Sequence, residues 1–290
     1  AIRQHHRDAH ITLLTTQPYA ALAQASGYFD AVWPFGRPKR RDVSGLVRVV
    51  AAMRGGKFER VYDLQTSTRS SFYYFLLLGQ TPQWSGIAPG CSHKHANPNR
   101  SRMHTIERQA EQLAVAGIET TPPPDLSWAR ADISRFNLPA SYALLAPGGS
   151  AHRQGKRWPA AQYGELAAWL AGRGILPVIL GSGAEQELAD TIEAGCPQAV
   201  SFVDRTDFFD ILALAAGARA AIGNDTGPMH LIAVRGCPSV ALFSSVSDPA
   251  RCAPRGRQVT ILRRASLAEL AVSEVIASLN IHKHSAFRAL

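Results

Sequence analysis

The chain has 290 residues, of which 46% are hydrophobic, and carries a formal net charge of +9. This length allows two domains of about 150 residues, each with its own apolar core. The longest apolar run, residues 72–78, falls far short of the ~20 residues that span a bilayer. We therefore expect neither a membrane-spanning segment nor a signal peptide.

The positive charge is compatible with nucleic acid, an anionic membrane surface or a phosphorylated substrate as partner, and also with a merely basic soluble protein. No zinc-finger spacing and no glycine–aromatic signature is present, so we do not expect nucleic acid. No C-x-x-C pair occurs, which argues against a metal site or a disulfide framework. We expect buried thiols in a reducing compartment. The four cysteines are Cys91, Cys196, Cys237 and Cys252.

The first half alternates between strands and helices. Ala1–His6 has the pattern of a helix end that runs into a strand. Because a doubly wound domain usually places a strand and a loop before such a helix, we expect the natural protein, or its gene, to begin upstream. The expected strands are 11–15, 31–35 and 60–64, and the expected helices are 18–25, 44–54, 66–78 and 103–116.

A proline-rich segment, residues 120–124, is incompatible with a helix and is the best linker candidate. It continues irregularly to about Ser141. We therefore place an N-terminal domain at residues 1–140 and a C-terminal domain at residues 141–290.

The second half alternates more clearly, and strands separated by helices favour parallel sheets with right-handed crossovers. Asp207 is expected to cap one helix, and Ser266 and Glu269 form the pattern of a capping box. Ligands of such sheets bind at the carboxyl ends of the strands, and two such domains leave a cleft between them. The expected strands are 142–146, 175–180, 199–203, 218–222 and 240–243, and the expected helices are 159–171, 184–194, 207–216, 229–234 and one from 266.

Three loops of the second half follow strand ends and should meet at one edge of the sheet. The first, residues 147–159, is glycine-rich, contains Ser150, Lys156 and Arg157, and leads into a helix opened by Pro159. These features suit a phosphate, although a solvated surface loop fits the pattern equally well.

The second loop, residues 181–185, begins like a dinucleotide-binding fingerprint, but Gln186 stands where its third glycine should be. No acidic residue ends the next strand, so we reject a nicotinamide cofactor. Glu185 either holds a ribose diol through paired hydrogen bonds or simply complements the helix dipole.

The third loop joins an apolar strand directly to a helix that starts near Pro228. Asp225 and Thr226 are positioned to cap that helix, Gly227 permits close approach of a ligand, and His230 lies in the first turn. Such a helix start is an anion site or, without a ligand, only a capped terminus. The three loops on one edge together favour a nucleotide diphosphate.

The same residues resemble the ADP-heptose:lipopolysaccharide heptosyltransferases, glycosyltransferase family 9. The string Asn224-Asp225-Thr226-Gly227-Pro228-Met229-His230-Leu231 is the most specific part of the resemblance. The other matching segments are residues 63–70, 102–117, 146–148, 156–159, 180–185, 242–243 and 248–249.

The resemblance implies the GT-B architecture, in which two Rossmann-like domains face each other across a cleft and the C-terminal one holds the donor. It implies an inverting, metal-independent transfer of heptose from ADP-heptose to the lipopolysaccharide inner core, with no cofactor. The donor-binding residues implied are Ser150, Lys156, Glu185, Asp225, Thr226, Gly227 and His230. The implied location is the cytoplasm of a Gram-negative bacterium, with peripheral contact to the anionic inner membrane.

The family's candidate base is an Asp in a Gly-Asp loop after the first strand of the N-terminal domain. This sequence lacks that strand and loop, so the catalytic residue is unassigned and expected upstream of Ala1. Asp63 ends a strand and is either a substitute or, more simply, a carboxylate bonded to backbone. Arg69 is a candidate for acceptor contact. No D-x-D motif for a metal ion occurs.

Two other functions remain open. A nucleotide-sugar epimerase has the same architecture but needs no acceptor. A truncated relative would bind ADP without turnover, which the missing Gly-Asp loop favours.

Overall fold

The computed structural model describes residues 1–39, 41–77, 79–80, 82–149 and 154–279. The chain divides into two compact units, Ala1–Pro123 and Pro124–Leu290. The boundary predicted after residue 140 falls inside the second unit. The reason is that residues ahead of it pack there: the ring of Phe136 stacks on Phe202 at 4.4 Å between centroids, and Arg135 pairs with Asp210 at 2.5 Å.

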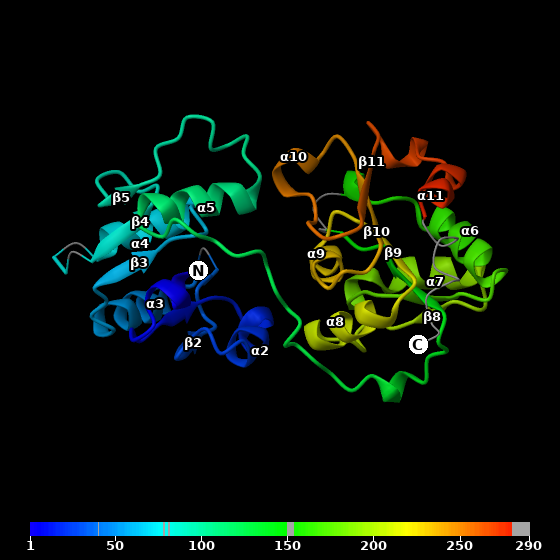
Figure 1. Ribbon diagram of the computed structural model, residues 1–290, viewed down its shortest axis with the longest axis horizontal. Helices are drawn as coiled ribbons and strands as arrows, with labels where there is room; N and C mark the ends of the chain where they lie inside the picture. The colour runs from blue at the N-terminus through cyan, green and yellow to red at the C-terminus, as the bar shows by residue number, and fades with distance from the viewer. Residues whose placement is uncertain (40, 78, 81, 150–153, 280–290) are drawn as a thin grey trace. The chain divides into compact units, whose positions relative to one another are not determined.

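The second unit is built on one parallel sheet of six strands (Figure 1). Its order is β11-β10-β9-β6-β7-β8, so the chain moves outward from β6 in one direction and then returns to β9 on the other side. The predicted doubly wound parallel sheet is thereby confirmed. The strands are β6 (Tyr142–Ala146), β7 (Leu176–Ile179), β8 (Val200–Ser201), β9 (Ala220–Asn224), β10 (Ser239–Phe243) and β11 (Val259–Arg263).

Helices cover both faces of this sheet. Successive side chains of β6 point to opposite faces, so apolar residues of this one strand pack against the helices on each side. Leu145 belongs to the core beneath α6, α7 and α11, and Leu144 to the core beneath α8 and α9. Both side chains are fully buried. The helices are α6 (Ala160–Ala171), α7 (Gln186–Gly195), α8 (Phe208–Gly217), α9 (Gly227–Val234), α10 (Pro249–Cys252) and α11 (Val272–Ser278), with 3-10 turns Ser134–Phe136, Gln154–Lys156, Gly183–Glu185 and Leu267–Glu269.

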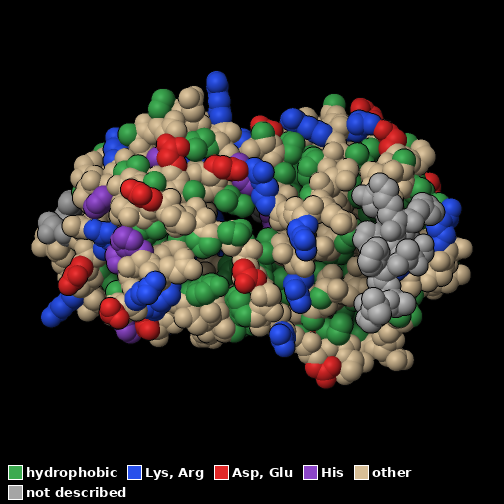
Figure 2. All heavy atoms as spheres, viewed as in Figure 1, with side chains coloured by type: hydrophobic (Ala, Val, Ile, Leu, Met, Phe, Trp, Pro, Cys, Tyr) green, Lys and Arg blue, Asp and Glu red, His purple; other side chains and the backbone are tan. Residues whose placement is uncertain are grey.

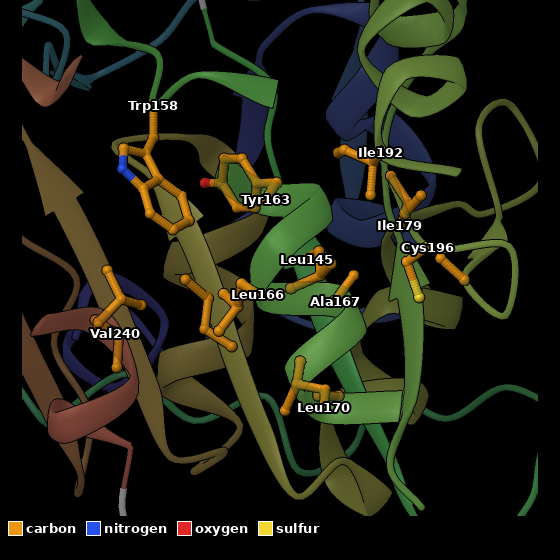
Figure 3. Close-up of a cluster of buried hydrophobic side chains, with 14 of the residues drawn as sticks. Leu145, Trp158, Tyr163, Leu166, Ala167, Leu170, Ile179, Ile192, Cys196 and Val240 are labelled. Atoms are coloured by element: carbon orange, nitrogen blue, oxygen red, sulfur yellow. The ribbon is translucent and has the colours of Figure 1, made fainter. Parts of the chain in front are cut away.

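Helix α6 shows why these residues form the core. Its predicted apolar stripe, Tyr163, Leu166, Ala167 and Leu170, is completely buried and lies on one side of the helix (Figure 3). Asp207 caps α8 as predicted, accepting from the Asp210 N–H at 2.9 Å. The predicted Ser266 capping box is wrong: Ser266 accepts from the Ala268 N–H instead, and α11 starts later.

The first unit carries two smaller parallel sheets, β1-β2 and β3-β4-β5. The predicted strands are present but shorter, whereas β4 and β5 escaped prediction because their sequences lack an apolar strand pattern. The strands are β1 (Thr12–Leu14), β2 (Ala31–Trp33), β3 (Arg60–Tyr62), β4 (Gln83–Gly86) and β5 (His93–Lys94), and the helices are α1 (Ile2–His5), α2 (Gln17–Ala25), α3 (Val43–Gly55), α4 (Thr68–Leu76) and α5 (Thr105–Val115).

No helix among the described residues is long and apolar enough to cross a bilayer. All four cysteines are free thiols; Cys91, Cys196 and Cys237 are buried, and Cys252 is half-buried.

Candidate functional site: an anion site at the carboxyl edge of the second sheet

Three loops meet at the carboxyl ends of β7, β6 and β9, which are neighbours in the second sheet. They are the β6 loop (residues 147–159), the β7 loop (residues 180–185) and the β9 loop (residues 225–226). The strand order reverses between β6 and β9, and ligands of doubly wound sheets bind at such a reversal. The edge predicted from the sequence is therefore the one that the fold forms.

Asn224 joins the β6 loop to β9. Its side chain is fully buried. The amide nitrogen donates to the carbonyls of Pro147 at 2.7 Å and Gly148 at 3.0 Å. The amide oxygen accepts from the Trp158 N–H at 3.1 Å and from the Tyr163 hydroxyl at 3.2 Å. This one side chain thus fixes both ends of the β6 loop, and it was not among the predicted site residues.

Lys156 and Asp225 form an ion pair between the β6 and β9 loops. The Lys156 ammonium lies 2.6 Å from Asp225 Oδ2, and the two side chains are only 12% and 9% exposed. A largely buried charge needs a partner, and here the ammonium and the carboxylate are each other's partner. The pair holds a cation beside the first turn of α9.

The first turn of α9 differs from its predicted form. Asp225 does not cap it, and its carboxylate accepts from Lys156 instead. Thr226 is the N-cap residue but makes no side-chain capping bond, and its Oγ1 is buried without a hydrogen-bond partner. Gly227 is exposed, with open space where a side chain would stand. The first N–H groups of a helix lack intrahelical acceptors, so this turn presents donors to an open space.

Arg157 and Glu185 link the β6 and β7 loops. Arg157 Nη2 donates to the Gly149 carbonyl at 2.7 Å and lies 3.8 Å from Glu185 Oε1. The Nε of Arg157 is buried without a partner. Glu185 Oε2 accepts from the Ser182 N–H at 3.0 Å and hydroxyl at 2.6 Å, which leaves Oε1 turned to the arginine.

A fourth loop, after β10, also reaches this edge and was not predicted to do so. The Val246 side chain lies against Gly155, and Cys252 Sγ is 3.9 Å from Asp225 Oδ2. Burial raises the pKa of the Cys252 thiol, and the Asp225 carboxylate raises it further. The signal available in the sequence was the Asp248-Pro249 helix start after an apolar strand.

The remaining predicted residues divide into three cases. His230 lies in the first turn of α9 and is half-buried. Ser150 lies outside the described residues. Arg69 belongs to the first turn of α4, in the other unit, and is half-buried.

Asp63 lies just after β3, also in the first unit, and is buried. Its Oδ1 accepts from the Thr66 backbone N–H at 2.9 Å, which is the simpler of the two roles considered for it. Its Oδ2 is buried without a partner, and burial raises the pKa of the carboxyl.

The described residues include no cluster of three or more His, Cys, Asp or Glu side chains arranged to hold a metal ion. On the face drawn in Figure 2, Lys and Arg side chains are interspersed with acidic and apolar ones.

The sequence profile of glycosyltransferase family 9 (heptosyltransferase) matches residues 46–276, a range that includes the three loops described above. The chain belongs to glycosyltransferase family 9. It is 26% identical over 248 residues to lipooligosaccharide heptosyltransferase 2 of Haemophilus ducreyi, a match that covers 76% of this chain and 71% of the relative.

Solved structures agree with this assignment at the level of the fold. The Escherichia coli ADP-heptose lipopolysaccharide heptosyltransferase II superposes with a TM-score of 0.75 at 20% identity, over 96% of this chain and 91% of the other. The E. coli heptosyltransferase WaaC with ADP gives 0.69 at 19% identity, over 95% and 91%. The predicted GT-B fold of the heptosyltransferases is thus confirmed.

Proposed function

We propose that this family 9 glycosyltransferase moves a heptose from ADP-heptose to the inner core of lipopolysaccharide. The observation that carries the proposal is the first turn of α9. There the Thr226 hydroxyl is buried without a hydrogen-bond partner, and Gly227 has open space where a side chain would lie. Both adjoin the largely buried Lys156–Asp225 ion pair. The names of the relatives supply the sugar: one solved relative is WaaC with ADP-2-deoxy-2-fluoro heptose.

The donor's diphosphate would lie beside Gly227, where helix N–H groups and the positive end of the dipole face open space. Thr226 Oγ1 and Arg157 Nε, both buried without partners, are the side-chain donors available to it. Lys156 would share its ammonium between Asp225 and a phosphate oxygen, and His230 would face the diphosphate or the sugar. Ser150 is assigned to the donor through the family resemblance alone.

Glu185 would hold the ribose of the nucleoside. Its Oε2 is fixed by Ser182 in the first turn before α7, so its position is set before the donor arrives. Its Oε1 is 3.8 Å from Arg157 and is the oxygen left to accept from a ribose hydroxyl.

The transfer is proposed to be inverting and independent of metal. Breaking the anomeric C–O bond leaves negative charge on the departing ADP. Lys156 and the α9 terminus are arranged in advance to stabilise that charge, the role that a divalent ion plays elsewhere. The acceptor hydroxyl must lose its proton to a base on the opposite face of the sugar; we assign no residue to that role.

The acceptor side is proposed from the first unit, with Arg69 as a contact for the anionic inner core. An enzyme that acts on such an acceptor would work at the cytoplasmic face of the inner membrane, and we propose that it binds the anionic surface there peripherally. Liposome flotation with and without anionic lipid measures that association.

The decisive experiment is ADP release from ADP-heptose with a heptose-deficient lipopolysaccharide acceptor, with and without EDTA. We expect turnover only with both substrates and no loss with chelator. An isomerised sugar nucleotide formed from donor alone would instead identify an epimerase. Calorimetric ADP binding without any turnover would identify a non-catalytic relative.

Lys156→Ala should weaken ADP affinity or turnover at least tenfold, about 1.4 kcal/mol, because it removes the ammonium beside the diphosphate. Lys39→Ala, at an exposed position of the first unit, is the matched control and should change neither. Because Asp225 would lose its partner, Lys156→Ala/Asp225→Asn separates lost binding from an unpaired buried charge. Unchanged affinity and turnover in Lys156→Ala would remove Lys156 from the site.

A further inference from the structure

Helix α3 carries apolar side chains on two of its sides. Val49 and Met53 are buried in the core of the first unit. Val43 and Val47, one turn apart on another side of the helix, are 71% and 60% exposed. The outer side of a surface helix is normally polar, so these two valines form an unusual apolar stripe that faces water.

Helix α4 adds to this apolar surface. Phe72 and Phe75, three residues apart, are 47% and 41% exposed. The two helices are neighbours, because Arg54 of α3 donates to the Leu76 carbonyl of α4 from Nε at 3.0 Å and from Nη2 at 2.7 Å. Their inner sides share one buried core. We call the exposed apolar surface the α3–α4 face, which is formed by Val43, Val47, Phe72 and Phe75.

The charge around the α3–α4 face is positive. Neither α3 nor α4 contains an Asp or Glu. Arg48 and Arg54 of α3 are exposed, and so are Arg41 and Lys57 at its two ends. The one acidic residue in the sequence from 41 to 57 is Asp42, the N-cap of α3. The face therefore combines exposed apolar side chains with cations.

Helix α5 of the same unit differs in its charge. Ile106 and Val115 of α5 are exposed apolar side chains as well. The same helix also carries Glu107 and Glu111, and both of these side chains are exposed. An anionic surface would repel the carboxylates of α5 and attract the arginines of α3. Charge complementarity thus selects an anionic partner for the α3–α4 face and excludes α5 from that contact.

We propose that the α3–α4 face docks on an anionic phospholipid bilayer, which names the surface for the peripheral association proposed above and depends on that part of the proposed function. Apolar side chains of an interfacial helix enter the boundary between headgroups and acyl chains, while neighbouring Lys and Arg side chains reach the phosphates. Each such cation raises the partition coefficient about fivefold. Because Arg69 lies in the first turn of α4, docking would hold this acceptor-side residue near the membrane.

The test is flotation of the full chain with phosphatidylcholine vesicles that contain either about one-third phosphatidylglycerol or none. We expect binding to the anionic vesicles only. Val47→Ser/Phe72→Ser should lower the partition coefficient about tenfold or more, because it removes apolar surface from the contact. Ile106→Ser/Val115→Ser, on α5, is the matched control and should bind like the unmodified chain. Since all four positions are exposed, Tm should stay within about 2 °C in both double variants.

Arg48→Gln tests the electrostatic part of the contact separately. It should weaken binding to anionic vesicles about fivefold at low salt. Near 1 M salt the Debye length is only about 3 Å, so the variant and the unmodified chain should then bind alike. A loss of the same size at both salt concentrations would contradict a contact between Arg48 and lipid phosphates.

Undiminished binding by Val47→Ser/Phe72→Ser, or an equal loss in the α5 control, would overturn the assigned face and leave the peripheral association in place. Absence of any binding to anionic vesicles would contradict both. Sedimentation velocity without lipid tests for a second copy as the partner. A dimer that only Val47→Ser/Phe72→Ser dissociates would show an interface between copies and overturn the lipid assignment. None of these readouts involves ADP or sugar transfer, so the result is independent of the donor-site test.

Discussion

At the scale of single residues, Thr226 provides the sharpest test of the proposed donor site, because its Oγ1 is buried without a hydrogen-bond partner. A buried hydroxyl without a partner costs about 1–3 kcal/mol, and such a group in a native fold calls for an explanation. Here the explanation proposed is the diphosphate, which would accept from this hydroxyl. Removing this hydroxyl should therefore weaken binding of the diphosphate without lowering the stability of the free protein.

Thr226→Val should leave Tm unchanged or raise it, since Oγ1 makes no hydrogen bond in the free protein. It should weaken ADP binding about fivefold or more, because a hydrogen bond to a charged group is lost. Calorimetry and thermal unfolding measure the two effects. Thr191→Val is the control, because that hydroxyl bonds only to its own helix, at the Glu187 carbonyl. Loss of stability without loss of ADP affinity would contradict the proposed role.

Asp63 gives a pH-dependent expectation. Burial raises its pKa in the folded protein above the ordinary value of 3.8, so the folded state holds this proton to higher pH than the unfolded state does. The free energy of unfolding therefore falls as pH rises from about 3.8 through the folded pKa. Below about pH 3.8 the Asp63 carboxyl is protonated in both the folded and the unfolded state, so it no longer lowers the free energy of unfolding.

Asp63→Asn keeps the oxygen that accepts from Thr66 and removes the charge. We expect it to raise Tm by about 2 °C at pH 7 and to have little effect at pH 3. Thermal unfolding of both proteins across that range measures the difference. A Tm gain at pH 3 that equals the gain at pH 7 would rule out the carboxyl charge as the cause.

At the scale of elements, the site depends on how loops are tied to strands. The β6 and β9 loops are far apart in sequence and meet through Asn224, with four hydrogen bonds, and through the Lys156–Asp225 pair. Gly148 also allows Glu185 close approach, since a Cβ there would lie 3.0 Å from its Cγ. The loops are thus positioned without a ligand, which lowers the ordering cost of binding one.

Asn224→Ala should lower the free energy of unfolding by about 3 kcal/mol, because it leaves several buried backbone and hydroxyl groups unpaired. ADP affinity should fall with it, since the β6 loop loses its anchor. Denaturant unfolding and calorimetry measure both. Asn99→Ala, at an exposed position in the first unit, is the control. A stable variant with normal ADP affinity would show that the Asn224 side chain does not position the β6 loop.

At the scale of the whole molecule, the two units differ in how their sheets are completed. The second has one continuous six-stranded sheet, and the first has sheets of two and three strands with a cavity between them. Stability in such a chain need not be uniform, and parts with fewer paired strands unfold first.

We expect two thermal transitions, with the first unit melting at the lower temperature. ADP at 100 times its Kd should stabilise only the second unit, by about 2.7 kcal/mol. Calorimetric scans combined with hydrogen exchange assign each transition to its unit. Stabilisation of the lower transition alone would place the nucleotide in the first unit and overturn the assigned site.

The sequence by itself determined the alternation of strands and helices, the parallel doubly wound second sheet, the α6 stripe and the family. These depend on local patterns: hydrophobic periodicity, caps such as Asp207, and the Asn224–Leu231 string. Each of these patterns is formed by residues close together in the chain, so it can be recognised from the sequence alone. Short strands with mixed composition, such as β4 and β5, have no such pattern and were missed.

Only the tertiary structure decided which groups near the site are satisfied. The sequence predicted that Asp225 and Thr226 cap α9. In the structure the Asp225 carboxylate instead accepts from Lys156, 69 residues away in the chain, and the Thr226 hydroxyl is buried without a partner. It also decided that the buried Asn224 side chain holds the β6 loop. Hydrogen bonding and burial depend on partners distant in sequence, and the fold alone chooses those partners.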